Sequence, residues 1–258
     1  MSEAVLDIRN LHKSFGEKVV HRGVSFQLQQ GEILALLGGS GTGKSVILRS
    51  IIGLEHPDEG EIIFAGQDLT RLSERALMKI RQRIAYVFQN GALFDSLTVE
   101  ENLSYSLREH TKLTEEQIHQ KVNAMLELID MSGSNSLLPA ELSGGMQKRA
   151  GLARAIILDP EIILFDEPTA GLDPVNTRRL LDNIHKLKAR GITGIFVTHD
   201  IPSALEIADR IAILYDGRIA VIDSVENIVR STDPLVQSFV SGSAEHNPDH
   251  HLGTPTHA

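Results

Sequence analysis

The sequence predicts an α/β fold with a mixed central sheet, an additional antiparallel β layer and an inserted helical subdomain. Short apolar runs at 33–37, 84–88, 161–165 and 194–197 are typical of strands buried on both faces. Between the second and third runs, the apolar residues from 91 to about 158 recur at helical spacing. We therefore expect one domain with a core at 1–90 and 159–240, a helical subdomain at 91–158 and a flexible tail at 241–258.

Composition excludes several classes of protein. A chain of 258 residues that is 41% hydrophobic and 23% charged is long enough to bury a full core. Its formal net charge of −9 argues against a nucleic-acid partner. The chain has no cysteine, so disulfides are excluded. We find no signal-peptide pattern and no apolar run of ~20 residues, and we expect a cytoplasmic protein without a membrane span.

A glycine-rich motif, GGSGTGKS, connects the apolar run at 33–37 to a helical pattern at 45–52. It fits the spacing G-x-x-x-x-G-K-[ST]. Backbone N–H groups in such a turn form a concave nest for phosphate oxygens, and the helix N-terminus adds partial positive charge. Lys44 supplies a charge to the β- and γ-phosphates, and the Ser45 hydroxyl is a hard ligand for Mg²⁺. We predict a nucleoside triphosphate at Gly38, Gly39, Ser40, Gly41, Thr42, Gly43, Lys44, Ser45 and Val46.

Two carboxylates follow the apolar run at 161–165. Asp166 and Glu167 are adjacent, so they repel each other, and a cation should compensate them. Since side chains alternate along a strand, we expect the two to point in different directions. Asp166 then suits the Mg²⁺ shell, and Glu167 suits a water molecule that attacks the γ-phosphate.

Polar residues also end two other predicted strands, where ligands bind in α/β sheets. Gln89 orients either Mg²⁺ or the attacking water, unless it is a simple turn residue. His199 donates a hydrogen bond to the γ-phosphate, unless it is a solvated loop residue. Phe15, beside a glycine, either stacks on an adenine ring or packs as an ordinary core residue.

A second anion nest is predicted at Ser143, Gly144 and Gly145, directly before a helical pattern that carries Lys148 and Arg149. An ordinary helix N-cap is the alternative. The remaining elements follow from alternation, helical spacing and turn residues. They are strands at 5–10, 18–28, 61–64, 211–214 and 219–222, turns at 66–68, 171–174 and 215–218, and helices at 73–83, 99–108, 115–131 (capped by Thr114), 146–158, 175–189, 203–208 and 234–240.

With these motifs in this order, residues 4–240 resemble the ATP-binding subunits of ABC transporters. Six motifs of this family occur in order. They are the Walker A loop, Gln89 of the Q-loop, the signature LSGGMQ, the Walker B segment IILFDE, the D-loop with Asp173 and the switch His199. The resemblance implies a P-loop NTPase fold with a RecA-like core and a homodimer. In it, Ser143, Gly144 and Gly145 of one copy close over ATP on the other. It also implies that Glu167 is the general base, that Lys44 and His199 stabilise the γ-phosphate, that Ser45, Gln89 and Asp166 hold Mg²⁺, and that Phe15 stacks on adenine.

Several segments are similar to the ATPases of MCE-type transporters, which include the Mla phospholipid systems. They are Val46 after the Walker serine, Gly91–Phe94, Lys148–Arg149 and Ser106–Leu113. This resemblance implies a membrane permease of the MlaE type, an MCE lipid-binding protein and a STAS-domain subunit of the MlaB type. It places the chain on the cytoplasmic face of a bacterial inner membrane.

The alternatives are the ATPase of an amino-acid or other small-solute importer, a soluble ABC protein acting on ribosomes or DNA, and an inactive regulatory subunit. The histidines of the tail either bind a metal or are simply solvated.

Overall fold

The computed structural model describes residues 4–241, which form two sheets. The first is antiparallel, with strand order β2-β1-β4-β5. Its strands are β1 (Ala4–Phe15), β2 (Lys18–Gln29), β4 (Glu59–Phe64) and β5 (Gln67–Asp68). The second has the order β10-β9-β3-β8-β7-β6, parallel except for the β9–β10 pair. Its strands are β3 (Ile33–Leu37), β6 (Ile84–Val87), β7 (Ile162–Asp166), β8 (Thr193–Val197), β9 (Arg210–Tyr215) and β10 (Arg218–Ser224).

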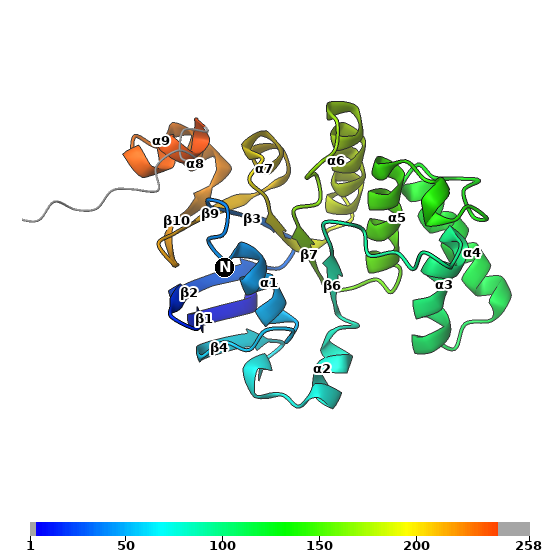
Figure 1. The fold of residues 1–258 in the computed structure, drawn as a ribbon, viewed down its shortest axis with the longest axis horizontal. Coiled ribbons are helices and arrows are strands. Elements are labelled where there is room, and N and C mark those ends of the chain that lie inside the picture. Colours follow the sequence, from blue (N-terminus) through cyan, green and yellow to red (C-terminus); the bar gives the residue numbers. More distant parts are fainter. Residues whose placement is uncertain (1–3, 242–258) are drawn as a thin grey trace, which may run out of the picture.

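The helices follow the strands in the order expected for an α/β fold. They are α1 (Lys44–Ile51), α2 (Glu74–Ile80), α3 (Val99–His110), α4 (Glu115–Leu128), α5 (Gly144–Ile156), α6 (Pro174–Lys188), α7 (Ile201–Ile207), α8 (Val225–Arg230) and α9 (Pro234–Val240). Helices α3, α4 and α5 gather at one side of the molecule, away from the antiparallel sheet (Figure 1). None of the helices within residues 4–241 combines the length and apolar character needed to cross a membrane.

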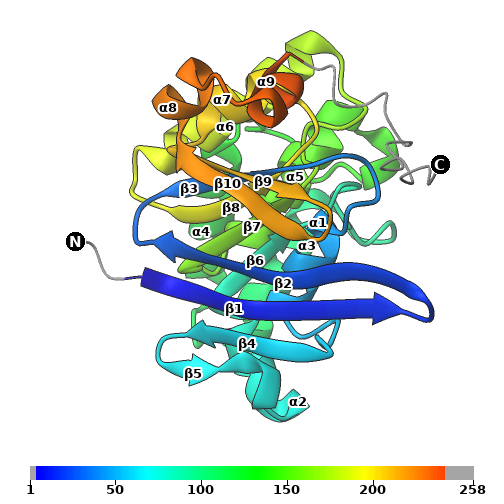
Figure 2. The same ribbon diagram turned by 90° about the vertical axis from the view of Figure 1, so that its left-hand side faces the viewer.

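Strand β3 shows why the central sheet is buried on both faces. Leu34 and Leu36 pack with the antiparallel sheet and α1, whereas Ala35 and Leu37 pack with helices α7, α8 and α9. All five residues of β3 are buried, which explains its continuous apolar sequence. The two sheets lie one above the other when seen from the side (Figure 2). The central sheet is therefore held between the antiparallel sheet with α1 and a layer of helices.

Several predicted boundaries were wrong, for local physical reasons. The helix predicted at 73–83 ends at Ile80, since Arg83 instead pairs with Glu161 (Nε to Oε1, 2.6 Å) and leads into β6. The helix predicted to reach 131 ends at Leu128, because Asp130 adopts a positive φ of 56°. The Thr114 cap is confirmed. The turn predicted at 66–68 contains the short strand β5, and α8 was not predicted. The proposed flexible tail lies, apart from residue 241, outside the described residues, as do its histidines.

Candidate nucleotide-binding site

The glycine-rich motif forms the turn between β3 and α1, and Val20 and His21 of β2 contact this turn. Gly43 caps α1 with φ 96° and ψ 15°. A Cβ atom on Gly43 would lie 2.3 Å from Val20 Cγ1, so only glycine fits here. The His21 ring is fully buried, and its Nε2 donates to Gly43 O at 3.0 Å. Burial lowers the pKa of His21. The loop is therefore held by a neutral histidine from the antiparallel sheet.

Lys44 lies across this loop. Its side chain is buried, and its Nζ donates to Gly38 O at 2.8 Å and to Gly39 O at 3.0 Å. Burial lowers the pKa of Lys44, while the nearby carboxylates of Glu167 and Asp166 act in the opposite direction. The site thus brings one ammonium group close to the two acidic residues that end β7.

Asp166 is the point where three elements meet. The Ser45 hydroxyl of α1 donates to Asp166 Oδ1 at 2.6 Å, and the Tyr86 hydroxyl of β6 donates to Asp166 Oδ2 at 2.6 Å. Burial raises the pKa of Tyr86, and the hydrogen bond to Asp166 adds to this shift. A hydroxyl and a carboxylate oxygen are ligands that Mg²⁺ prefers. Within residues 4–241 no three acidic, His or Cys side chains gather as a metal site, so further ligands would come from water and phosphate.

Glu167 and Asp166 contact different neighbours, and strand alternation does not explain this difference. The strand ends at Asp166, and Glu167 has a positive φ of 51°. Its backbone N–H donates to Val197 O at 3.0 Å, which fixes this turn beside β8. Glu167 Oε2 lies 2.7 Å from His199 Nδ1, an ion-pair distance without hydrogen-bond alignment. This contact brings the carboxylate that follows β7 together with the histidine that follows β8.

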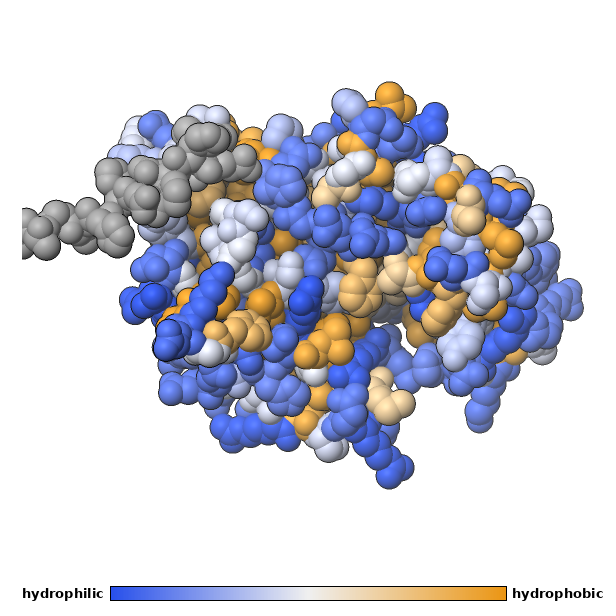
Figure 3. All heavy atoms as spheres, in the orientation of Figure 1, coloured by the Kyte–Doolittle hydropathy of each residue, from blue (hydrophilic) through white to orange (hydrophobic). Residues whose placement is uncertain are grey.

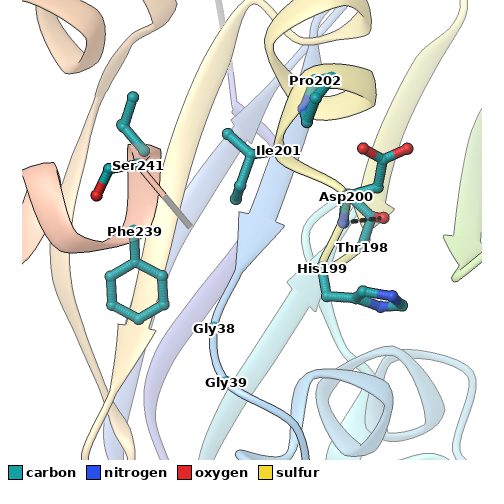
Figure 4. A pocket seen from close by; sticks show the side chains of 10 residues that line it. Gly38, Gly39, Thr198, His199, Asp200, Ile201, Pro202, Phe239 and Ser241 are labelled. Atoms are coloured by element: carbon teal, nitrogen blue, oxygen red, sulfur yellow. Dashed lines mark hydrogen bonds between the residues drawn. The ribbon is translucent and has the colours of Figure 1, made fainter. Parts of the chain in front are cut away.

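His199 lies at the edge of a pocket of about 380 Å³ beside the phosphate loop. Figure 4 shows its ring next to Thr198 and Asp200, with Gly38 and Gly39 on the neighbouring loop. The Asp200 N–H donates to Thr198 Oγ1 at 3.0 Å, which shapes this turn after β8. Phe239 of α9 forms the opposite wall. The start of the loop and the switch histidine thus open into one space.

The signature segment begins α5 rather than preceding it. The helix starts at Gly144 and not at residue 146, and Ser143 is its N-cap, with Oγ accepting from the Met146 N–H at 3.3 Å. A Cβ atom on Gly145 would lie 2.3 Å from Asn176 Oδ1, and Asn176 Nδ2 donates to Asp173 Oδ2 at 2.6 Å. The predicted D-loop aspartate therefore lies beside the signature glycines of the same copy.

The structure does not bring every predicted residue into the site. Gln89 is exposed, and its side chain makes no hydrogen bond to any residue in 4–241. Phe15 ends β1 with 45% of its surface exposed, and Lys13 Nζ lies 4.9 Å from its ring centroid. In the described chain no hydrogen bond joins Ser143, Gly144 or Gly145 to the loop at 38–45. Within residues 4–241 the two predicted anion nests are thus not joined by any hydrogen bond.

The sequence alone does not assign Tyr86 to the site, yet Tyr86 binds the Asp166 carboxylate. Lys148 of α5, which the sequence places beside the second predicted anion nest, has an unexpected contact. It donates to Pro168 O at 3.0 Å and to Ala170 O, so it holds the segment that follows Glu167.

Comparison with known proteins identifies the family of this chain. Residues 21–170 match the family model described as ABC transporter. Two relatives are each 40% identical to this chain. They are the MlaF ATP-binding proteins of the intermembrane phospholipid transport systems of Haemophilus influenzae and Escherichia coli K12. The alignments cover 95% and 93% of this chain and 93% and 90% of those proteins. A protein of Mycobacterium tuberculosis H37Rv named probable ribonucleotide transport ATP-binding protein mkl is 42% identical over 92% of this chain and 66% of its own.

Solved structures give the same result. CbiO1 of Clostridium perfringens, part of the ABC transporter complex cbiONQ, superposes with a TM-score of 0.81 at 26% identity, over 92% of this chain and 95% of that one. The ATP-binding cassette MJ0796, a dimer in a post-hydrolysis state with ADP and Pi, gives 0.78 at 31% identity, over 85% and 98%. Motifs, fold and relatives agree, and this chain belongs to the ABC transporter family, as an ATP-binding subunit that hydrolyses ATP.

Proposed function

We propose that two copies of this chain bind ATP between them, with the phosphate loop of one copy facing Ser143, Gly144 and Gly145 of the other. Two observations support this arrangement. Within the described residues the two predicted anion nests of one copy share no hydrogen bond, and the related MJ0796 cassette is a dimer with ADP and Pi. In this arrangement Ser143 accepts from its own helix and still has its proton to donate to a phosphate.

Within each ATP site the residues of this chain have different roles. Backbone N–H groups of the loop and the Lys44 ammonium bind the phosphates, and Phe15 stacks on the adenine. Ser45 and Asp166 would hold Mg²⁺, whose charge stabilises the transferring phosphoryl group, and Gln89 would complete that shell. Glu167 accepts the proton of the attacking water, and His199, whose Nδ1 lies 2.7 Å from Glu167 Oε2, positions Glu167 and donates to the γ-phosphate. The 2.6 Å contact between Ser45 and Asp166 is the observation that carries this assignment.

We further propose that this ATPase drives phospholipid transport through an MlaE-type permease. The two MlaF relatives, at 40% identity over nearly their whole length, support this substrate class. The chain has a groove of about 460 Å³ between α1 and α2 on one side and α3 and α5 on the other, and a cytoplasmic segment of the permease would dock there. An MCE lipid-binding protein and an MlaB-type STAS subunit complete the proposed assembly. This chain would then be peripheral on the cytoplasmic face of the bacterial inner membrane.

The groove suits a protein segment because its walls mix exposed apolar and basic side chains. Met78 and Phe88 are 57% and 42% exposed, although both are large and apolar. Arg154 of α5, which lines the groove, lies over the Phe94 ring, 4.4 Å from its centroid. Figure 3 shows the surface hollowed between α2 and the helices α3 and α5, with hydrophobic side chains nearby.

A nucleotide-related substrate is the second candidate, because the mycobacterial relative named for ribonucleotide transport is 42% identical. One experiment distinguishes the phospholipid substrate from the nucleotide-related one. The chain is co-purified with its partners from detergent-solubilised membranes and reconstituted into vesicles with labelled phospholipid. We expect a permease and an MCE protein to co-purify, and phospholipid to move only with ATP. A periplasmic-binding-protein importer among the partners, or ATP-driven movement of ribonucleotide without lipid, would refute the lipid assignment.

A further inference from the structure

One side chain belongs to both the groove and the ATP site. The hydroxyl of Tyr86 donates to Asp166 Oδ2 at 2.6 Å, inside the proposed Mg²⁺ site. The ring of the same residue lines the groove together with Phe88, Met78 and Arg154. Asp166 itself is buried and does not line the groove, and Tyr86 connects the groove lining to this carboxylate.

The ring of Tyr86 is held by a neighbour that is open to a partner. Its centroid lies 4.3 Å from that of Phe88, with the two planes tilted by 37°. Phe88 is the first residue after β6 and is 42% exposed. A segment seated in the groove would therefore press on Phe88 and, through it, on the Tyr86 ring.

The hydrogen bond to Asp166 is sensitive to such a movement. A tyrosine ring is rigid, so its hydroxyl oxygen moves whenever the ring tilts or slides. At 2.6 Å the bond is short, and hydrogen bonds weaken steeply as distance and angle depart from the preferred range. The other oxygen of Asp166 is held by Ser45. A shift of the Tyr86 hydroxyl would therefore change how the carboxylate is held about the Ser45 contact.

We propose that Tyr86 is a positioning residue that transmits occupancy of the groove to the orientation of the Asp166 carboxylate. This link is separate from Gln89, which is exposed and bonds to no described residue. It rests on the proposed role of Asp166 in holding Mg²⁺. In an assembled transporter the permease segment bound in the groove fixes the position of the Tyr86 ring. The ring in turn fixes the orientation of the Asp166 carboxylate.

The direct test is Tyr86→Phe, which keeps the ring and removes only the hydroxyl. Mn²⁺ binding to the ADP-bound protein, followed by electron paramagnetic resonance, reports on the metal site without turnover, since Mn²⁺ prefers the same oxygen ligands as Mg²⁺. We expect Mn²⁺ affinity to fall about 10-fold, as for other residues that orient a metal ligand. Tyr105→Phe is the matched control, because Tyr105 is 48% exposed and packs on Phe94. It should leave Mn²⁺ affinity and the melting temperature unchanged.

Phe88→Leu tests the transmission itself. It alters the groove wall without touching Asp166, and we expect it to weaken Mn²⁺ binding about threefold in the native background and not in Tyr86→Phe. Equal effects in both backgrounds, or a Tyr86→Phe protein that binds Mn²⁺ within twofold of the wild type, would overturn the inference. Asp166→Asn tests the proposed metal site itself: if this variant too retains Mn²⁺ affinity, the proposed role of Asp166 is wrong and the inference about Tyr86 fails with it.

Discussion

Ser45 and Asp166 are 121 positions apart, yet the Ser45 hydroxyl donates to Asp166 Oδ1 at 2.6 Å. The contact joins the first turn of α1 to the end of β7, with β8 lying between β3 and β7 in the sheet. It places a hydroxyl and a carboxylate at the carboxyl edge of the parallel strands, where an α/β sheet binds its ligand. The phosphate loop and the Walker B segment therefore form one site.

Replacement of Glu167 by Gln tests the general base. The amide keeps the size of the side chain and cannot accept a proton from water. We expect ATP turnover to fall about 10²–10⁴-fold while ATP affinity stays within a few-fold of the wild type. Steady-state hydrolysis and binding of a fluorescent ATP analogue measure the two quantities. A variant with normal turnover would remove Glu167 from this role.

Lys44→Ala tests the phosphate cradle. Losing a charged hydrogen bond costs about 1.5–3 kcal/mol, so ATP should bind roughly 10–100-fold more weakly. Lys79→Ala makes the same chemical change at an exposed position of α2 and should leave binding unaltered. Calorimetric titration compares the two variants, and equal ATP affinity in both would contradict the site.

The two signature glycines offer a matched pair of substitutions. Gly145→Ala would place a methyl group 2.3 Å from Asn176 Oδ1, and Asn176 is held by Asp173. We expect a loss of about 1–3 kcal/mol of stability, which is roughly 2–4 °C of melting temperature per kcal/mol. Gly144→Ala meets open space and should melt at or slightly above the wild-type temperature, because alanine favours a helix. Identical melting of the two variants would show that the Asn176 contact is absent.

His21 predicts how stability depends on pH. Burial lowers its pKa from the ordinary value of 6.5, so the unfolded chain takes up this proton before the folded one. The contribution of neutral His21 to the free energy of unfolding is complete above about pH 6.5, and it is lost as the pH falls toward the lower pKa of His21 in the folded protein. The melting temperature should therefore drop less between pH 7 and 5 in His21→Gln than in the wild type. His56→Gln, at an exposed position, should keep the wild-type slope, and a His21→Gln protein that also keeps it would contradict the prediction.

The sequence predicted best what depends on local pattern. Strand β3 was predicted with its observed ends, because a fully buried strand is one continuous apolar run. Helix α9 was also predicted with its observed ends, and the structure shows Asp233 as its N-cap with Pro234 in its first turn. Contacts that depend on pairing between distant segments could not be predicted from the sequence. The contact of Tyr86 with Asp166 requires that β6 and β7 pair in parallel, with Val87 opposite Phe165, and no property of Tyr86 alone signals it.

The most direct test is the oligomeric state of the Glu167→Gln protein saturated with Mg-ATP. Blocked hydrolysis should trap the closed assembly, so light scattering should give the mass of two chains with ATP and of one chain without nucleotide. If the protein remains a single chain with ATP, both in solution and within its membrane assembly, the proposed sandwich of ATP between two copies is wrong.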